Sequence, residues 1–230
     1  MRVGGELIFP HVTENRRAAL VTGGTGRVGS AIAARLGAEG FSVLAAGRRD
    51  SDITRPEEAR TLVERAAQEL GGLDLLVNAA SDGFVPRPVE EVSEADWDAA
   101  LDSTAKGTFF VTQAAVPHLR ASSLGLVVMI EDVGAYRPWP SFGPHCAAKA
   151  AQAMLTRIFA RALAPDIRVC GIAPGPVAVE PEQEERRAAE TLLGRIGSPE
   201  DIAGAVAYLV GAGFVTGSTL FVDGGRSLNP

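Results

Sequence analysis

Short apolar runs alternate with longer amphipathic stretches along most of this chain. Runs of about five apolar residues predict strands, and stretches of about ten or more with helical spacing predict helices. The expected strands are Ala18–Thr22, Phe41–Ala46, Leu73–Asn78, Leu126–Ile130, Ile167–Ile172 and Leu220–Val222. The expected helices are Val28–Ala38, Pro56–Leu70, Glu94–Leu119, Pro144–Ala164 and Pro199–Val210. This alternation predicts a doubly wound (Rossmann) α/β fold, with a parallel sheet of six to seven strands and helices on both faces.

Local signals refine two of these elements. Ser198 directly before Pro199 is a natural N-cap with proline in the first turn, which marks the start of the last helix. Asp52 and Ile53 follow the second strand almost at once, which leaves no room for a further crossover helix and strand, so we expect the sheet to lack one member there. Neither a repeat nor a linker is visible, which predicts a single domain over residues 16–230 after an extension over residues 1–15.

The composition favours a small-molecule partner. The 230 residues are 46% hydrophobic, enough for a buried core, and the net charge is −6 at pH 7 with no acidic or basic tail, so no nucleic-acid surface is expected. No apolar run reaches the roughly 18 residues of a membrane span. Cys146 and Cys170 form no C-x-x-C pair, which indicates free thiols and a cytoplasmic location. His11 and His118 lack ligand-like spacing, so no metal site is expected.

Lysine is rare in this chain. Arginine outnumbers lysine 20 to 2, and the two lysines are Lys106 and Lys149. An arginine keeps its charge under all ordinary conditions, whereas the pKa of a lysine responds to burial and to neighbouring charges. We therefore expect chemistry at the positions where lysine is retained.

A glycine-rich turn follows the first strand and leads into the first helix. Its sequence is Thr22-Gly23-Gly24-Thr25-Gly26-Arg27-Val28-Gly29. Glycines at this point allow the backbone to approach a pyrophosphate closely, and the helix N-terminus offers unpaired N–H groups. In the order strand, turn, helix, this pattern predicts a dinucleotide site, and the alternative is an ordinary glycine-rich turn. The expected cofactor contacts here are Gly23, Thr25, Gly26, Arg27, Val28 and Gly29.

The end of the second strand bears on the choice between the two nicotinamide cofactors. The sequence there is Gly47-Arg48-Arg49-Asp50. Guanidinium groups of Arg48 or Arg49 suit the 2′-phosphate of NADP, to which they can form two parallel hydrogen bonds. Asp50 keeps NAD as an alternative, because a carboxylate here would bind the ribose hydroxyls. A solvated arginine pair without a ligand is the other interpretation.

Several further segments resemble the short-chain dehydrogenase/reductase family, from about Ala18 to Leu228. They are Leu75-Leu76-Val77-Asn78-Ala79-Ala80, Pro174-Gly175-Pro176-Val177, Arg195-Ile196-Gly197-Ser198-Pro199-Glu200-Asp201-Ile202-Ala203 and Val215-Thr216-Gly217-Ser218-Thr219-Leu220-Phe221-Val222-Asp223-Gly224-Gly225. The resemblance implies an NAD(P)-dependent oxidoreductase that forms homodimers or homotetramers. The further cofactor contacts that it implies are Asp52, Ile53, Asn78, Ala79, Ala80, Lys149, Pro174, Gly175 and Val177.

Within that family, the chain is most similar to pteridine reductases. Those proteins carry arginine within the glycine turn, where Arg27 stands here, and aspartate in place of the catalytic serine, where Asp132 stands. The glycine turn also fits the T-G-x-x-G-x-x-G pattern of longer relatives that act on nucleotide sugars, but the chain length and the C-terminal motif argue against them. The resemblance implies a small carbonyl or imine substrate, with a pterin among the candidates.

The family's catalytic tyrosine and lysine stand four residues apart, and here the corresponding residues are His145 and Lys149. This spacing places both on one helix face. By resemblance, Lys149 would bond the nicotinamide ribose and act on the residue at position 145. An imidazole is shorter than a tyrosine, so His145 either transfers a proton through an intervening water or only fills the pocket.

The other catalytic positions also differ from the family's pattern. Asp132, thirteen residues before His145, would hold substrate or relay a proton, since a carboxylate accepts the N–H donors of a nitrogen-rich ring; the alternative is a loop-facing aspartate beside Glu131. Thr104 falls where an asparagine supports the proton relay, and Tyr136 is placed to lend a hydroxyl to the pocket. Two functions follow: an NADP(H)-dependent reductase, or a dinucleotide-binding protein without proton transfer that serves as a cofactor sensor or assembly partner. An ordinary carbonyl reductase is a third.

Overall fold

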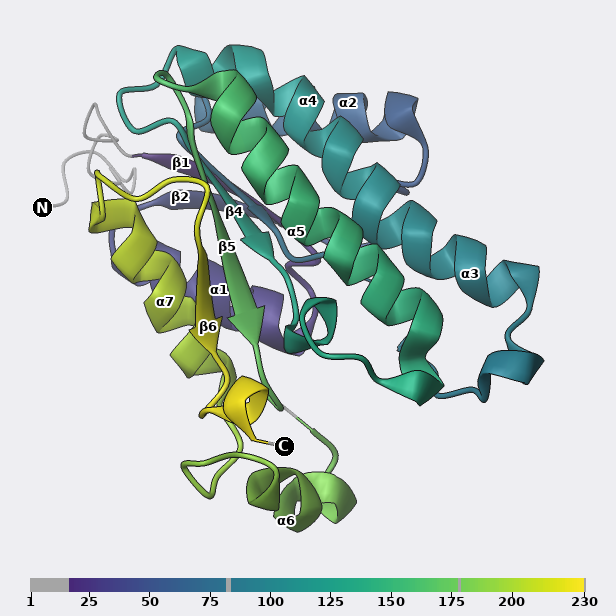
Figure 1. Ribbon diagram of the computed structural model, residues 1–230. Coiled ribbons are helices and arrows are strands. Elements are labelled where there is room, and N and C mark those ends of the chain that lie inside the picture. Colours follow the sequence, from purple (N-terminus) through teal and green to yellow (C-terminus); the bar gives the residue numbers. More distant parts are fainter. Residues whose placement is uncertain (1–16, 82–83, 178, 230) are drawn as a thin grey trace, which may run out of the picture.

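Six parallel strands form the centre of the structure, a computed structural model that describes residues 17–81, 84–177 and 179–229. Their order in the sheet is β2-β1-β3-β4-β5-β6 (Figure 1). The strands are β1 Ala18–Thr22, β2 Ser42–Ala46, β3 Leu75–Asn78, β4 Leu126–Ile130, β5 Arg168–Pro174 and β6 Thr219–Val222. All six predicted strands are therefore confirmed, with small shifts at their ends.

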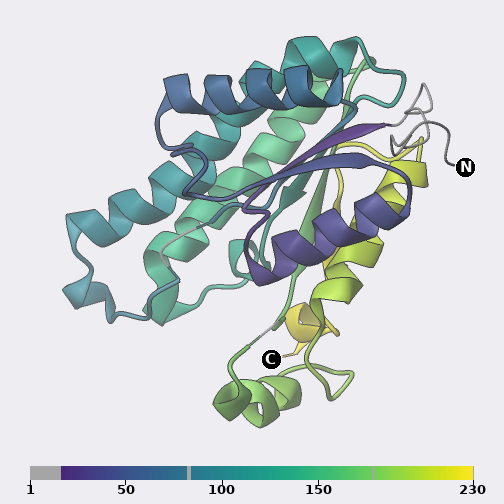
Figure 2. The same ribbon diagram turned by 180° about the vertical axis from the view of Figure 1, so that it is seen from behind.

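Helices cover both faces of the sheet (Figures 1 and 2). They are α1 Arg27–Ala38, α2 Pro56–Leu70, α3 Glu94–Leu101, α4 Gly107–Arg120, α5 Gly143–Leu163, α6 Pro181–Ala189 and α7 Pro199–Gly211. Successive strand residues point to opposite faces, so Leu20 packs with α2, α4 and α5 whereas Val21 packs with α1 and α7. The doubly wound α/β prediction is confirmed.

The predicted helix over Glu94–Leu119 contains an interruption that the pattern did not show. A π-helical turn, Asp102–Lys106, separates α3 from α4 while the backbone stays helical throughout. Such turns are frequent at functional sites, and this one contains Thr104. A second difference is α6, which was not predicted because it buries no residue and so has no apolar face.

The segment after β2 runs directly into α2, so β2 is an edge strand and the sheet has six members. This confirms the expectation of a missing strand at that edge. Ser198 caps α7 as predicted: its hydroxyl accepts from the backbone N–H of Asp201, and its own N–H donates to the Asp201 carboxylate at 2.8 Å. The expected extension over residues 1–15, with His11, lies outside the described residues.

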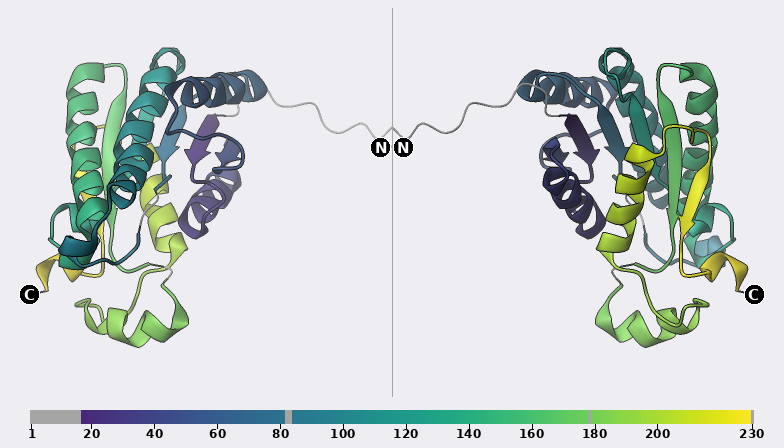
Figure 3. Two further views of the ribbon diagram at one scale, coloured as in Figure 1. Left: turned by 90° about the vertical axis from the view of Figure 1, so that its right-hand side faces the viewer. Right: turned by 90° about the vertical axis from the view of Figure 1, so that its left-hand side faces the viewer.

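All strands point the same way, so their carboxyl ends meet at one edge of the sheet. Figure 3 shows that α6 and the C-terminal segment also lie at this end of the molecule. In such sheets, ligands bind outside the carboxyl edge. Among the described helices, none combines the length and apolarity needed to cross a membrane.

The turn between β1 and α1 is closed by a contact between two glycines. A Cβ atom added to Gly29 would lie 2.2 Å from the carbonyl oxygen of Gly23, which has a φ of +66°. Gly23 itself lies against the backbone of Ala79 at the end of β3, where an added Cβ would approach a carbonyl carbon to 2.7 Å. Side chains at either position would force α1 away from the sheet.

Replacing Gly29 with alanine is therefore expected to destabilise the fold by about 1–3 kcal/mol, the usual cost of overpacking. Gly37 offers a matched control on the same helix, because no described residue lies within 4 Å of an added Cβ there. Gly37→Ala should stabilise the protein by about 0.5–1 kcal/mol through helix propensity. Urea unfolding of both variants checks the pair, and equal effects would contradict the close approach.

Candidate active site

A cavity of about 270 Å³ lies at the carboxyl ends of β1, β2 and β3. It brings together many of the residues predicted to hold a cofactor, which are Gly23, Thr25, Gly26, Arg48, Asp52, Ile53, Ala79 and Ala80. It also contains residues that sequence reasoning missed, among them Ser51, Thr54 and Ser81. For Ser81, the position shortly after the predicted strand Leu73–Asn78 was the available signal, because carboxyl ends of parallel strands share this edge. Ser51 and Thr54 stand farther from the end of the second predicted strand, so no such signal marked them.

The start of α1 has the features of an anion site. Gly26 caps the helix without a side-chain hydrogen bond, and no acidic residue stands in the first turn. The N–H groups of that turn and the positive end of the helix dipole therefore face the cavity, and no side chain of the cap or of the first turn offsets their positive charge. Glycines keep the backbone bare at this point, so the residues present fit the pyrophosphate of a dinucleotide.

The two arginines after β2 differ in their position relative to the cavity. Both arginines are exposed, but Arg48 lines the cavity and Arg49 does not. The Asp50 carboxylate accepts a hydrogen bond of 2.8 Å from the Gly47 N–H and so closes the turn, outside the cavity lining. Asp52 accepts from the hydroxyl of Thr54 at 2.7 Å, and this hydrogen bond lowers the pKa of the Asp52 carboxyl. Arg48 is therefore the cation placed toward a ligand.

A second cavity, of about 350 Å³, opens beside the first at the ends of β4 and β5. It is lined by Val28, Ala79, Ser81, Phe84, Ile130, Glu131, Asp132, His145, Lys149, Pro174, Gly175 and Val177. Asp132, His145 and Lys149 therefore meet as predicted, the last two from one face of α5. Arg27 lies apart, on the surface, where it pairs with Glu180 at 2.8 Å.

Lys149 is held by two hydrogen bonds inside the protein. Its Nζ donates to the backbone oxygen of Ile130 at 2.7 Å and to the side chain of Gln152 at 3.1 Å, and Gln152 in turn donates to Thr108 at 3.1 Å. Burial lowers the pKa of Lys149 to about 8, although Asp132 and Glu131 act in the opposite direction. The ammonium is fixed in place and is easier to deprotonate than an ordinary lysine.

The imidazole of His145 is 4% exposed, and neither ring nitrogen has a hydrogen-bond partner among the described residues. Nε2 lies 3.6 Å from a carboxylate oxygen of Asp132, which is within range of an ionic contact and too long for a hydrogen bond. The ring of Phe84 packs edge-on against the imidazole, with centroids 4.9 Å apart. An unpartnered buried polar group of this kind fits a bound ligand or water.

The two acidic residues after β4 have different surroundings. Asp132 accepts a 2.6 Å hydrogen bond from the Gly134 N–H and turns its other oxygen toward His145, so it is not merely loop-facing. Glu131 is buried and accepts hydrogen bonds from the hydroxyls of Thr156, Tyr136 and Thr219 at 2.6, 2.7 and 3.1 Å.

The prediction that Tyr136 lends its hydroxyl to the pocket is wrong. That hydroxyl donates a hydrogen bond to the buried Glu131 carboxylate, and Tyr136 does not line the cavity that contains His145. Burial, followed by the bond to Glu131, raises the pKa of Tyr136 to about 12, so this phenol holds its proton firmly.

Three other predicted residues stand behind the cavity walls. Thr104 is buried, and its hydroxyl shares a hydrogen bond of 3.1 Å with Ser81, which lines both cavities. Asn78 binds Thr112 at 3.0 Å and so ties β3 to α4 instead of facing either cavity. Lys106 forms a surface ion pair with Asp102 at 3.2 Å, so the expectation of chemistry at both lysines is wrong for Lys106.

The buried ammonium of Lys149 makes a pH-dependent contribution to stability. Between pH 8 and about 10.5, the unfolded chain holds the Lys149 proton and the folded chain releases it, so stability rises with pH in this window. Relative to Lys149→Met, the native protein should gain about 2 kcal/mol between pH 7 and pH 10. Urea unfolding of both proteins at the two pH values measures the gain, and a pH-independent difference would contradict the burial of a charged lysine.

Comparisons with known proteins agree with this geometry. The model of the enoyl-(acyl carrier protein) reductase family matches residues 28–227. The 3beta-hydroxysteroid dehydrogenase 1 of Eggerthella lenta is 34% identical to this chain, in an alignment that covers 92% of this chain and 94% of the relative. Dehydrogenase/reductase SDR family member 4 of Sus scrofa is 33% identical, in an alignment that covers 92% of this chain and 87% of the relative. A 3-ketoacyl-(acyl-carrier-protein) reductase from Brucella melitensis, solved with NADH, matches with a TM-score of 0.86 at 27% identity, over 92% of this chain and 98% of that one. The chain therefore belongs to the short-chain dehydrogenase/reductase family of NAD(P)-dependent oxidoreductases.

Proposed function

We propose that this protein is an NADP(H)-dependent reductase of a small carbonyl or imine substrate, with a pterin among the candidates, and that His145 stands in the position of the family's catalytic tyrosine. The observation that carries the proposal is the pair of unpartnered, buried ring nitrogens of His145, beside Asp132 and Lys149. Most buried polar groups have a hydrogen-bond partner, so two unpartnered nitrogens on one ring beside a cavity support a site for a ligand or a water.

Each of the two cavities would bind a different part of the cofactor. The glycine turn and the start of α1 would hold the pyrophosphate, and Arg48 would bind a 2′-phosphate. The segment Pro174–Val177 and Lys149 would hold the nicotinamide end in the second cavity. The cofactor supplies a hydride when it is bound. The protein supplies the proton and positions the substrate relative to the cofactor.

The proton step falls to His145 and its neighbours. Asp132 Oδ2, 3.6 Å from Nε2, would orient the imidazole while a water carries the proton to the substrate. Asp132 would also accept an N–H of the substrate, which favours a nitrogen-rich ring such as a pterin over a simple ketone.

Two observations favour a second function. Phe84 packs on a histidine that is already 4% exposed, and the Thr104 hydroxyl, at the expected relay position, is bound to Ser81. A protein that binds the dinucleotide without proton transfer, as a sensor or an assembly partner, would tolerate this arrangement. The exposed apolar residues Met154 and Ile158 on α5 support a homo-oligomer in either case. The two free thiols support a cytoplasmic location.

Cofactor choice is tested at the arginine pair. Arg48→Ala should weaken NADPH binding by about 10- to 100-fold, the value of a charge-assisted hydrogen bond, and should change NADH binding little. Arg49→Ala is the matched control and should leave both affinities near the native values, because Arg49 does not line the cavity. Fluorescence titration of the reduced cofactors measures all four constants. An equal loss for NADH and NADPH in Arg48→Ala would speak against NADP specificity.

Proton transfer is tested at position 145. NADPH oxidation is followed with pterins, quinones and ketones for the native protein, His145→Phe and His145→Tyr. A catalytic histidine predicts a loss of about 100-fold or more in His145→Phe with cofactor affinity retained, since general acid–base catalysis contributes about 10²–10⁴-fold. Activity that appears only in His145→Tyr would favour the sensor function, and activity on ketones without pterins would favour an ordinary carbonyl reductase.

A further inference from the structure

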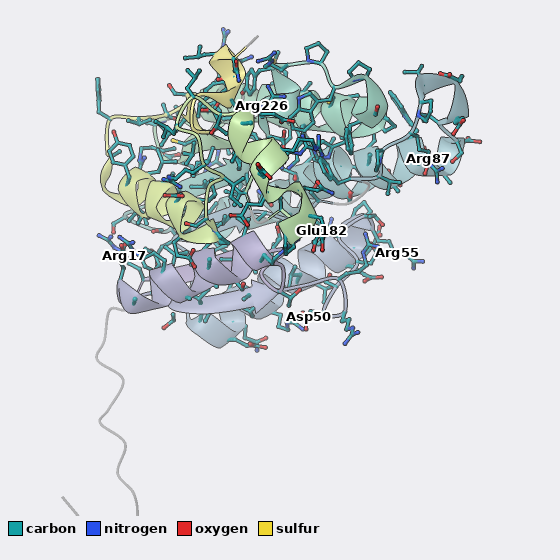
Figure 4. The ribbon with its side chains drawn as sticks, turned by 90° about the horizontal axis from the view of Figure 1, so that it is seen from below. Arg17, Asp50, Arg55, Arg87, Glu182 and Arg226 are labelled. Atoms are coloured by element: carbon teal, nitrogen blue, oxygen red, sulfur yellow. The ribbon has the colours of Figure 1, made fainter. Side chains whose placement is uncertain are left out.

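A third cavity, of about 360 Å³, continues outward from the histidine cavity. The two share Phe84, Asp132, Gly175 and Val177. The outer walls of this cavity come from α6 and the C-terminal turn Arg226–Leu228, which lie side by side at the carboxyl edge of the sheet. Figure 4 looks onto this edge and shows Arg226 in the C-terminal segment beside α6. A substrate that reacts near His145 would extend into this space.

Two guanidinium groups face the outer end of this cavity and share the carboxylate of Glu190, which the exposed Arg186 also approaches at 3.5 Å. Glu190 Oε2 accepts from Arg187 Nη1 at 3.1 Å and from Arg226 Nε at 3.1 Å. The side chains of Arg187 and Arg226 are only 18% and 15% exposed, and Glu190 is 25% exposed. Arg187 and Arg226 are therefore held in place and largely removed from bulk water, where their charges act strongly.

The charges at this end do not balance. Arg187 and Arg226 share the single Glu190 carboxylate, which leaves one positive charge in excess at this end, whereas the charged side chains of the whole cavity lining balance. Arg27 and Glu180 neutralise each other at 2.8 Å, and Asp132 lies at the opposite end, beside His145. Within the described residues, Arg226 donates through Nε alone, so both of its Nη groups are left for a ligand. A partly buried cation of this kind is costly unless an anion joins it.

We propose that the substrate carries a carboxylate, which Arg187 and Arg226 bind at the outer end of this cavity. The proposal rests on the proposed function, because it takes the reacting carbonyl or imine to lie beside His145. One carboxylate supplies one negative charge, which matches the excess. Planar guanidinium groups also match the two oxygens of a carboxylate with parallel hydrogen bonds.

Aromatic side chains occupy the wall between the two ends. Phe84 and Trp139 both line the cavity and meet edge-to-face with centroids 6.3 Å apart. They offer a surface for a planar ring, so the substrate class is a ring-bearing carbonyl or imine compound with an acidic arm.

The test compares 4-formylbenzoate with methyl 4-formylbenzoate, which differ in the charge of the arm. Each is titrated by calorimetry into the protein loaded with NADP⁺, so that the aldehyde is not reduced. The native protein should bind the acid at least about tenfold more tightly than the ester, and Arg187→Met or Arg226→Met should bring this ratio close to one. Affinity for the ester should stay within about twofold in these variants, because the ester loses no ionic partner.

Arg186→Met is the matched control, because Arg186 approaches the same Glu190 at 3.5 Å from the same helix but is 61% exposed and does not line the cavity. It should keep the native ratio. Arg187→Lys, which keeps the charge, should retain a preference for the acid. If one methionine variant fails to fold, the other methionine variant decides the matter. A purely structural role for the arginines predicts lower melting temperatures with an unchanged ratio.

Equal native affinities for acid and ester, or a ratio that survives in both methionine variants, would overturn the proposal. NADPH oxidation is measured in a separate assay, with the same protein variants and with NADPH in place of NADP⁺. An acid preference without any turnover would count against the reductase and leave the carboxylate site standing, so the two failures can be told apart.

Discussion

A buried carboxylate at the end of β4 organises the site. Glu131 is almost fully removed from water, and such a group is tolerated only when hydrogen bonds replace its hydration. Three hydroxyls do so, from α5, from β6 and from the loop after β4. The carboxylate also lies against Gly171 on β5, where an added Cβ would approach Oε1 to 2.1 Å. One side chain thus fixes four parts of the fold relative to one another.

The hydrogen bonds of Glu131 also fix the positions of the residues on either side of it, Ile130 and Asp132. Ile130 presents the carbonyl oxygen that anchors Lys149, and Asp132 presents the oxygen that faces His145. Because the strand end cannot shift without breaking the bonds of Glu131, these two positions are set before any ligand arrives. Preorganised polar groups of this kind need no rearrangement when charge develops during a reaction.

The sequence was sufficient for the strands, for the glycine turn and for the meeting of Asp132, His145 and Lys149. Those features depend on local patterns and on the rule that carboxyl ends of parallel strands share an edge. The sequence did not predict the position of the Tyr136 hydroxyl. That hydroxyl donates to Glu131, and the sequence pattern indicated no role for Glu131 beyond its place next to Asp132. Thr219, the third partner, is 88 residues away from Glu131, and no local pattern predicts such a contact. The π-helical turn was missed for a similar reason, since its residues keep ordinary helical spacing.

The scarcity of lysine leaves the protein with an unusual chemical surface. Lys149 is 4% exposed, whereas the side chain of Lys106 is 44% exposed on the π-helical turn. Reagents that acylate amines therefore meet a single accessible lysine side chain in the described part of the chain. A dye or a resin attached there would hold the molecule in one orientation, with both hydrogen bonds of Lys149 intact.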